Sequence, residues 1–358
     1  MEIYFVAFAG LLILKEVPNL HGRMDRNVNS AIGLLAFLVL TWLAAFRVDT
    51  GTDYNTYAQI WTGTLDVSEA TVDDVFFQFL EPLFVATNTL LKTITERSAV
   101  FFAFYAVLTI YPLHRAIVHF RINQAHAYIV YLGAFYLPYA FNGMRQAVTM
   151  SLFLFSLKYI LANRPWTVWL IGIVAAGFHL TGLLIPLAYY AHRVMERRNC
   201  SPATVLMVGL PCAAAVGQAG LGGRIFFAAF DYKIETYSEL FSEGNTIANT
   251  VFRIMLASIL VFSARLRPDD RTVRQLLNIY LLGLFVYLGL SEFNVLATRF
   301  NMFFRVLEVI LIPLLMSRLR GPKFALIYIT TTALLFATLW TVANEPDYQY
   351  QSILSAAR

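Results

Sequence analysis

The chain has 358 residues, of which 58% are hydrophobic and 15% aromatic, whereas only 14% are charged. Soluble domains carry about 25% charged residues, so this composition excludes an ordinary soluble protein and predicts an integral membrane protein. The formal net charge of +5 does not indicate nucleic-acid binding, because the basic residues stand in short loops beside apolar runs, where the positive-inside rule accounts for them.

Apolar runs recur along the whole chain. About 20 apolar residues cross a bilayer as a helix, and backbone groups in lipid must be bonded within the segment, so these runs are predicted to be helices. They cover residues 3–17, 28–46, 98–118, 124–141, 146–162, 165–192, 203–218, 251–264, 275–291, 299–316 and 324–343. The sequence therefore predicts an all-α polytopic membrane protein with about twelve crossings. It has no internal repeat or long linker, so we expect one domain over residues 1–358.

The first apolar run has no basic n-region and no small-residue cleavage site, so it is predicted to be a retained span and not a signal peptide. Loops with several Lys or Arg are placed in the cytoplasm. The two longest polar segments, 47–80 and 219–250, then lie outside, as do both termini.

The run 81–95 leaves two topologies open. If it crosses the membrane, 165–192 is one long helix; if it is re-entrant or interfacial, 165–192 is two short helices that meet near His179. The second topology places the basic loops 115–121 and 158–164 in the cytoplasm, so the charge rule favours it.

The polar segment FRVDTGTDYNTY follows the second apolar run. Gly51 permits a turn that a side chain would obstruct, so the chain is expected to fold back and bring Arg47 close to Asp53. A snorkelling Arg47 and an interfacial Tyr57 are the simpler explanation.

The segment FNGMRQ precedes the run 146–162. Asn142 and the glycine after it break the helix before Arg145 and Gln146. A positive side chain at a helix N-terminus lies at the unfavourable end of the helix dipole, so an anion is expected nearby, and a phosphate suits the planar fork of arginine. An ordinary cytoplasmic arginine is the alternative.

Three more ionisable residues stand in or beside apolar runs: Glu81, His179 and Arg299. A neutral imidazole takes up a proton near pH 7, so His179 is a candidate general base, although an interhelical hydrogen bond would also explain it. Glu81 precedes Pro82 and is also suited to a helix start. In the favoured topology all these residues lie near the outer face, which predicts a site for a polyanion beside a base.

Taken in order, these segments resemble the EpsG family of bacterial polysaccharide polymerases, which are functionally akin to the Wzy O-antigen polymerases. The resemblance rests on R-x3-G-x-D-x3-Y from Arg47 to Tyr57, Glu81 with Pro82, NGMRQ, FHLTGLLIPL around His179, and Arg299. The C-terminal NEPDYQYQSI resembles the family's Pro/Tyr-rich end.

The resemblance implies a membrane glycosyltransferase related in fold to the GT-C enzymes, in the bacterial cytoplasmic (inner) membrane, with its active site facing the periplasm or the cell exterior. Such an enzyme transfers a growing exopolysaccharide or O-antigen glycan from undecaprenyl diphosphate to the next lipid-linked repeat unit. Its partners would be the two lipid-linked oligosaccharides, membrane lipids, a chain-length regulator and a flippase.

The residues then take roles in this reaction. The catalytic residues would be His179, Asp53 and Arg145, and the substrate-binding residues would be Arg47, Arg299, Gln146, Glu81, Tyr57 and Asn142. Arginines would stabilise the leaving diphosphate, and either His179 or Asp53 would be the base in a one-step inverting displacement. Two separated carboxylates are a poor ligand set for a divalent ion, so no metal and no cofactor are expected.

Two rival functions remain. A ligase of the O-antigen type differs only in its acceptor, which the sequence does not describe. A transporter or flippase would use the same arginines to bind cargo, but transporters tend to show repeat symmetry, and none is seen here. The aromatic residues of 219–250 fit a saccharide-lining loop and a plain interfacial helix equally well.

Overall fold

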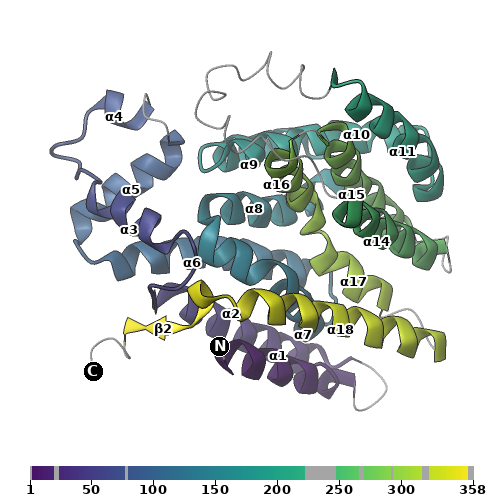
Figure 1. Cartoon of the computed structure of the whole chain (residues 1–358), viewed down its shortest axis with the longest axis horizontal. Helices are drawn as coiled ribbons and strands as arrows, with labels where there is room; N and C mark the ends of the chain where they lie inside the picture. Colours follow the sequence, from purple (N-terminus) through teal and green to yellow (C-terminus); the bar gives the residue numbers. More distant parts are fainter. Residues whose placement is uncertain are drawn as a thin grey trace. The chain divides into compact units, whose positions relative to one another are not determined.

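The computed structural model describes residues 2–19, 24–76, 80–221, 247–265, 270–291, 293–316 and 322–353. The aromatic residues Phe226 to Phe241, predicted to line a saccharide or form an interfacial helix, lie outside these ranges. Within the described residues the chain is predominantly helical, as predicted (Figure 1). It groups into two compact units, Met1–Ile185 with Glu308–Arg358, and Pro186–Leu307.

The first unit is built from helices and one short strand pair. Its elements are α1 (Glu2–Leu14), η1 (Val17–Asn19), α2 (Arg26–Ala45), β1 (Arg47–Val48), α3 (Tyr54–Thr62), α4 (Val72–Phe76), α5 (Pro82–Ile94), α6 (Ser98–His119), α7 (Gln124–Tyr131), the π-helix η2 (Leu132–Asn142), α8 (Met144–Leu161), α9 (Pro165–Ala176), η3 (Leu180–Leu183), α17 (Glu308–Met316), α18 (Pro322–Ala343), η6 (Pro346–Tyr348) and β2 (Gln351–Ser352).

Local sequence signals set several of these boundaries. The carboxylate of Asp25 accepts the backbone N–H of Asn27 at 2.8 Å and caps α2. Pro82 and Pro165 occupy the first positions of α5 and α9, where a missing N–H costs no helical hydrogen bond. These signals explain why both helices begin where the sequence changes from polar to apolar.

An aromatic cluster packs α3, α5, α6 and α8 together. Its buried members are Tyr57, Trp61, Phe84, Phe101, Phe102, Tyr105, Met144, Val148 and Phe178. The ring of Tyr54 stacks on Phe102 at 4.8 Å between centroids. Because aromatic side chains bury large areas, this cluster holds the polar segment after α2 against the start of α8.

The second unit contains α10 (Leu184–Arg197), which begins in the first unit, and α11 (Pro202–Gln218), α14 (Ile247–Arg265), α15 (Arg271–Gly289) and α16 (Asn294–Arg305). Helices α11 and α15 pack closely through two glycines. A Cβ on Gly209 would lie 2.2 Å from the ring of Phe285, and one on Gly217 would lie 2.2 Å from the carbonyl oxygen of Leu288.

Five of the described helices are long and apolar enough to cross a membrane, by length and composition. They are α2, α6, α14, α15 and residues Leu326–Ala343 of α18. Helices α1, α9 and α11 are apolar but shorter, with 13, 12 and 17 residues. The twelve crossings expected from the sequence therefore stay a prediction, because several apolar runs form helices shorter than a span.

The apolar run 165–192 is two helices. Helix α9 ends at Ala176, the turn η3 follows His179, and α10 begins at Leu184. A Cβ on Gly182 would lie 2.2 Å from the backbone nitrogen of Ala176, so the chain folds back tightly here. This break is the one that the re-entrant topology requires.

Candidate functional site

Arg47 follows α2 directly and its side chain is only 1% exposed. The guanidinium donates to the carbonyl oxygen of Ala44 at 2.6 Å and to that of Phe141 at 3.2 Å, and it contacts the sulfur of Met144 at 3.0 Å. The rings of Phe102 and Phe141 lie 4.8 and 4.7 Å from its centre. Arg47 therefore connects the end of α2 to the loop before α8.

No carboxylate pairs with this cation among the residues that the structure describes. Burial lowers the pKa of Arg47 to about 10, so the guanidinium stays charged at pH 7. A buried charge without a counter-ion is costly, and an anion near Arg47 would offset that cost.

The turn expected at Gly51 is present, with φ of 104°. A Cβ on Gly51 would lie 2.7 Å from Oδ1 of Asn142 and 3.0 Å from the carbonyl oxygen of Phe141. The position therefore needs glycine both for its backbone conformation and for space. The polar segment after α2 and the FNGMRQ loop touch at this point.

Among the described residues Arg47 forms no ion pair with Asp53; its guanidinium donates to the backbone carbonyls of Ala44 and Phe141 instead. Asp53 is half-buried at the start of α3, and within the described part of the chain its carboxylate makes no hydrogen bond or ion pair. Its charge helps to raise the pKa of Tyr57 and of Tyr348, after the larger effect of burial. Asp53 thus lies among phenols with its oxygens available.

The C-terminal segment closes over the same turn. Strands β1 and β2 pair antiparallel, with Arg47 opposite Ser352. The backbone N–H of Gly51 donates to the carbonyl oxygen of Asp347 at 2.6 Å, and the amide of Asn142 donates to the hydroxyl of Tyr348. The Pro/Tyr-rich end is therefore part of the site.

Arg145, in the first turn of α8, forms an ion pair with Glu81. The side chains are 20% and 11% exposed. The hydroxyl of Tyr57 is hydrogen-bonded to Arg145 as well, and burial raises the pKa of Tyr57, so this hydroxyl stays protonated at neutral pH. Glu81 therefore supplies one anion near Arg145 from the same chain, and a phosphate at this arginine stays a prediction.

His179 caps the turn η3. Its Nδ1 accepts the backbone N–H of Thr181 at 3.3 Å and lies 2.8 Å from the hydroxyl of the same residue. That hydroxyl is 3.1 Å from the hydroxyl of Thr149, which stands one turn after Arg145 on α8. Since Nδ1 accepts a hydrogen bond, the proton of the neutral ring is on Nε2.

The helix that carries Glu81 at its cap is joined to the same turn. The backbone N–H groups of Leu83 and Phe84 donate to the carbonyl oxygen of Gly177 at 2.9 and 3.0 Å. The structure therefore brings eight of the nine predicted site residues into one unit: Arg47, Asp53, Tyr57, Glu81, Asn142, Arg145, Gln146 and His179. Gln146 is buried beside Arg145.

Arg299 belongs to the second unit, where it is exposed on α16. Its neighbours in the chain, Thr298 and Asn301, accept hydrogen bonds from Arg253 at 3.3 and 2.5 Å. Arg253 is buried in the candidate span α14, and its guanidinium lies 3.9 Å from the ring centre of Tyr287. Arg253 is not among the predicted site residues, although an arginine inside the apolar stretch VFRIMLASIL is itself a signal.

Several buried polar atoms of the first unit have no hydrogen-bond partner within the described ranges. They include Nε of Arg47, Nε of Arg145, Oδ1 of Asn142 and the hydroxyls of Tyr4 and Tyr350. Buried polar groups are normally satisfied, so atoms left unpaired around one turn mark a place where a polar ligand could bind. Within the described ranges no three His, Cys, Asp or Glu side chains gather as a metal site would need.

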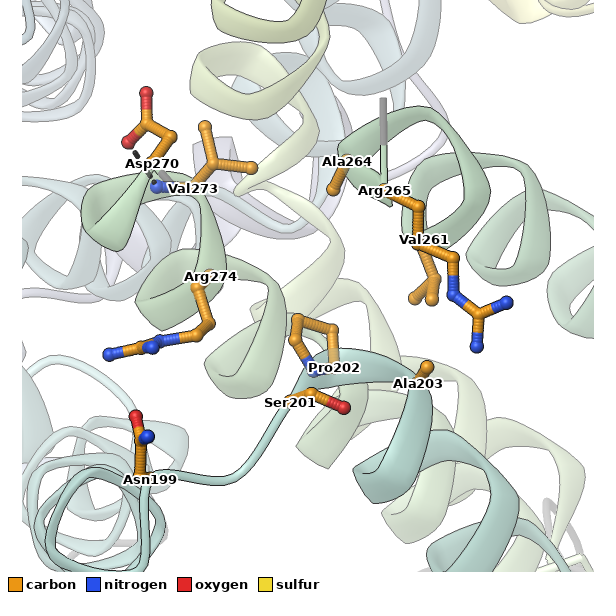
Figure 2. A pocket seen from close by; sticks show the side chains of 10 residues that line it. All are labelled: Asn199, Ser201, Pro202, Ala203, Val261, Ala264, Arg265, Asp270, Val273 and Arg274. Carbon is orange, nitrogen blue, oxygen red and sulfur yellow. Dashed lines mark hydrogen bonds between the residues drawn. The ribbon is translucent and has the colours of Figure 1, made fainter. Parts of the chain in front are cut away.

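A pocket of about 300 Å³ lies in the second unit, and none of the predicted site residues lines it. Figure 2 shows it between the start of α11 and the facing ends of α14 and α15. Its polar groups serve the fold: Asp270 accepts the N–H of Val273 at 3.0 Å, and Arg274 lies 3.8 Å from Glu196. We assign this pocket no role in the reaction.

Comparison with known proteins gives one match. A family model described as the EpsG family matches residues 30–352, which is nearly the whole chain. No curated protein matches, and no solved structure matches, so the GT-C-like fold stays a prediction from the resemblance.

Proposed function

The chain belongs to the EpsG family, and from this premise we propose that it is a polysaccharide polymerase that transfers a growing glycan from undecaprenyl diphosphate to the next lipid-linked repeat unit. The reaction takes place at the outer face of the cytoplasmic membrane. The single observation that carries the proposal is the grouping of Arg47, Asp53, Glu81, Arg145 and His179 in one unit, around a turn whose buried polar atoms lack partners.

The transfer needs one bond to form as another breaks. The acceptor hydroxyl oxygen attacks the anomeric carbon, its proton passes to a base, and the bond from that carbon to the diphosphate breaks with its electron pair going to the leaving group. Catalysis therefore requires a proton acceptor and positive charge at the diphosphate. Arg145 provides the charge, because its side chain is partly exposed while Glu81 and Tyr57 hold its position.

Asp53 is the better candidate for the base. Its carboxylate makes no hydrogen bond within the described ranges and lies beside two phenols. His179 offers a proton on Nε2, since its Nδ1 accepts from the backbone. We assign His179 a hydrogen bond to a phosphate oxygen and Asp53 the acceptor proton, in a displacement that inverts the anomeric carbon.

Arg47 acts through its charge and through the loop that it holds. Its guanidinium is buried against Phe141 and Met144, so it positions the residues before Arg145 and adds positive potential beneath the diphosphate. Asn142, at the end of η2, and Gln146, in the first turn of α8, stand on either side of Arg145 in the sequence and contribute polar atoms to the substrate. Arg299 lies in the second unit, and its binding to a diphosphate stays a prediction from the resemblance.

The test is incubation of the purified protein with one lipid-linked repeat unit. A ladder of products is expected. Arg145→Ala should slow the formation of this ladder by at least about 100-fold. The matched control is Arg164→Ala, which changes an exposed arginine beyond the other end of α8 and should leave the ladder unchanged. Unchanged substrate with intact binding would overturn the proposal and favour transport of the lipid-linked saccharide. Equal loss in both variants would show that the site is elsewhere.

A further inference from the structure

The pocket of the second unit lies where two candidate spans end. Helix α14 ends at Arg265 and α15 begins at Arg271, and both helices are long and apolar enough to cross a membrane. The pocket of about 300 Å³ lies between these two ends and the start of α11 (Figure 2). Because both helices are candidate spans, the pocket lies at the level where the hydrocarbon of a bilayer gives way to its headgroups.

Two arginines line this pocket. Arg265 is exposed, and among the described residues its guanidinium makes no hydrogen bond or ion pair. Arg274 is partly buried, and the carboxylate of Glu196 lies 3.8 Å from it, which is beyond hydrogen-bonding distance. Glu196 is instead held by Arg271, at 2.7 and 2.8 Å. The guanidiniums of Arg265 and Arg274 therefore have donors available for a ligand.

One carboxylate also lines the pocket. Asp270 accepts the N–H of Val273 at 3.0 Å and caps α15, and its carboxylate points away from Arg274 (Figure 2). The described lining thus carries two positive charges and one negative charge, a balance that matches the single negative charge of a phosphodiester. On the facing side, Ala203 lies in the first turn of α11, where N–H groups have no intrahelical partner and favour an anion.

We propose that this pocket binds the phosphate of an anionic phospholipid from the cytoplasmic leaflet. Residues 265–274 contain four arginines, and the positive-inside rule places such a segment in the cytoplasm. Basic pockets between membrane helices on that side bind anionic headgroups. Arg265 and Arg274 donate to the phosphate oxygens from two sides of the pocket. The inference concerns the second unit alone and does not rest on the proposed reaction.

The apolar surroundings favour a lipid over a soluble phosphate. Four apolar residues line the pocket beside the arginines: Pro202, Ala203, Val261 and Ala264. Close by in the chain, Phe262 in the last turn of α14 is 63% exposed, and Met207, one turn after Ala203 on α11, is 67% exposed. Acyl chains that continue from a bound phosphate along α11 and α14 would cover such side chains. A soluble phosphate would leave them bare.

Native mass spectrometry of the full chain in detergent tests the assignment. The dissociation constant of the first bound phosphatidylglycerol is measured for the parent protein, Arg265→Gln, Arg274→Gln and the double variant. Each single variant should weaken binding about fivefold, and the double variant about 25-fold. The matched control is Arg197→Gln, which removes the same charge from an exposed position of α10 outside the pocket. It should bind as the parent does, and equal weakening in the control would overturn the proposal.

Two further ligands identify the class of molecule that is bound. Phosphatidylcholine has the same acyl chains and no net charge, so it should bind at least about fivefold more weakly than phosphatidylglycerol. Glycerol phosphate has the charge and no acyl chains, so it should not displace phosphatidylglycerol at equal concentration. Displacement by glycerol phosphate would assign the pocket to a soluble phosphate, and equal binding of phosphatidylcholine would show that charge is not recognised. Either result overturns the proposal.

Photolabelling of the unaltered chain gives a readout that needs no variant. The probe is a phosphatidylglycerol with a diazirine on its headgroup, in nanodiscs that contain the full chain. Labelled peptides are expected to cover residues 199–203 and 261–274, and excess unlabelled phosphatidylglycerol should remove the label. Labelling confined to other peptides would show that the lipid binds elsewhere, which contradicts the proposal.

Discussion

Disruption of the Arg145–Glu81 ion pair tests the organisation of the site most directly. The change is a double-mutant cycle of Glu81→Gln, Arg145→Gln and the double variant. The two single variants should differ, because the remaining arginine in Glu81→Gln keeps its hydrogen bond with Tyr57. In Arg145→Gln, Glu81 is left as a largely buried carboxylate, so this variant should be the less stable of the two.

The size of the coupling follows from burial. Exposed ion pairs contribute about 0–1 kcal/mol, and breaking a fully buried pair costs about 3–5 kcal/mol. With side chains 20% and 11% exposed, the Arg145–Glu81 pair lies between these limits, where a charge-assisted hydrogen bond contributes about 1.5–3 kcal/mol. We expect a coupling free energy of about 2 kcal/mol.

The assay is thermal unfolding of the four proteins in one detergent, followed by tryptophan fluorescence. Trp61 is a suitable reporter because it is buried in the aromatic cluster beside Tyr57. For a chain of this length the coupling corresponds to roughly 3 °C of non-additivity in Tm. Additivity within about 0.5 kcal/mol would refute the ion pair, and with it the conclusion that Glu81 is the anion near Arg145.

Three further changes probe the turn and its chemistry. Gly51→Ala should lower the free energy of unfolding by about 2–4 kcal/mol through strain and overpacking. Gly143→Ala, where a Cβ meets nothing closer than 3.7 Å, should lower it by about 1 kcal/mol or less. Similar Tm values for the two variants would contradict the required turn. Asp53→Asn should slow product formation by at least about 100-fold with Tm unchanged, and normal ladders would remove Asp53 as the base. Tyr348→Phe should lower the free energy of unfolding by about 1–2 kcal/mol, because it removes the hydroxyl that accepts from the Asn142 amide. The control is Tyr350→Phe, since the Tyr350 hydroxyl has no partner in the described part of the chain, and it should show no such loss in Tm.

Much of the site could be predicted because its residues are unusual for their surroundings. Arg145 at a helix start and His179 inside an apolar run each needed an explanation, and the structure places both in one unit. Gly51 predicted a turn, and its φ of 104° confirms it.

The partners of these residues could not be predicted. Arg47 binds two backbone carbonyls, and Glu81 pairs with a residue 64 positions away. Backbone acceptors leave no trace in side-chain patterns, and a pair so far apart in the chain has no periodicity. The number of spans could not be predicted either, because hydropathy does not show where an apolar run breaks, as 165–192 does after Gly177.

The strand pair has a consequence for biosynthesis. Thr50 accepts the N–H of Gln351, a residue 301 positions later, so a segment synthesised much later completes the wall around the first polar segment. Contacts between such distant residues form late, and domains fold from the N-terminus during synthesis. A nascent chain whose helices had folded up to α18 would therefore still hold Arg47 in an open turn, and the wall of the candidate site would be complete only after Gln351 and Ser352 had left the ribosome.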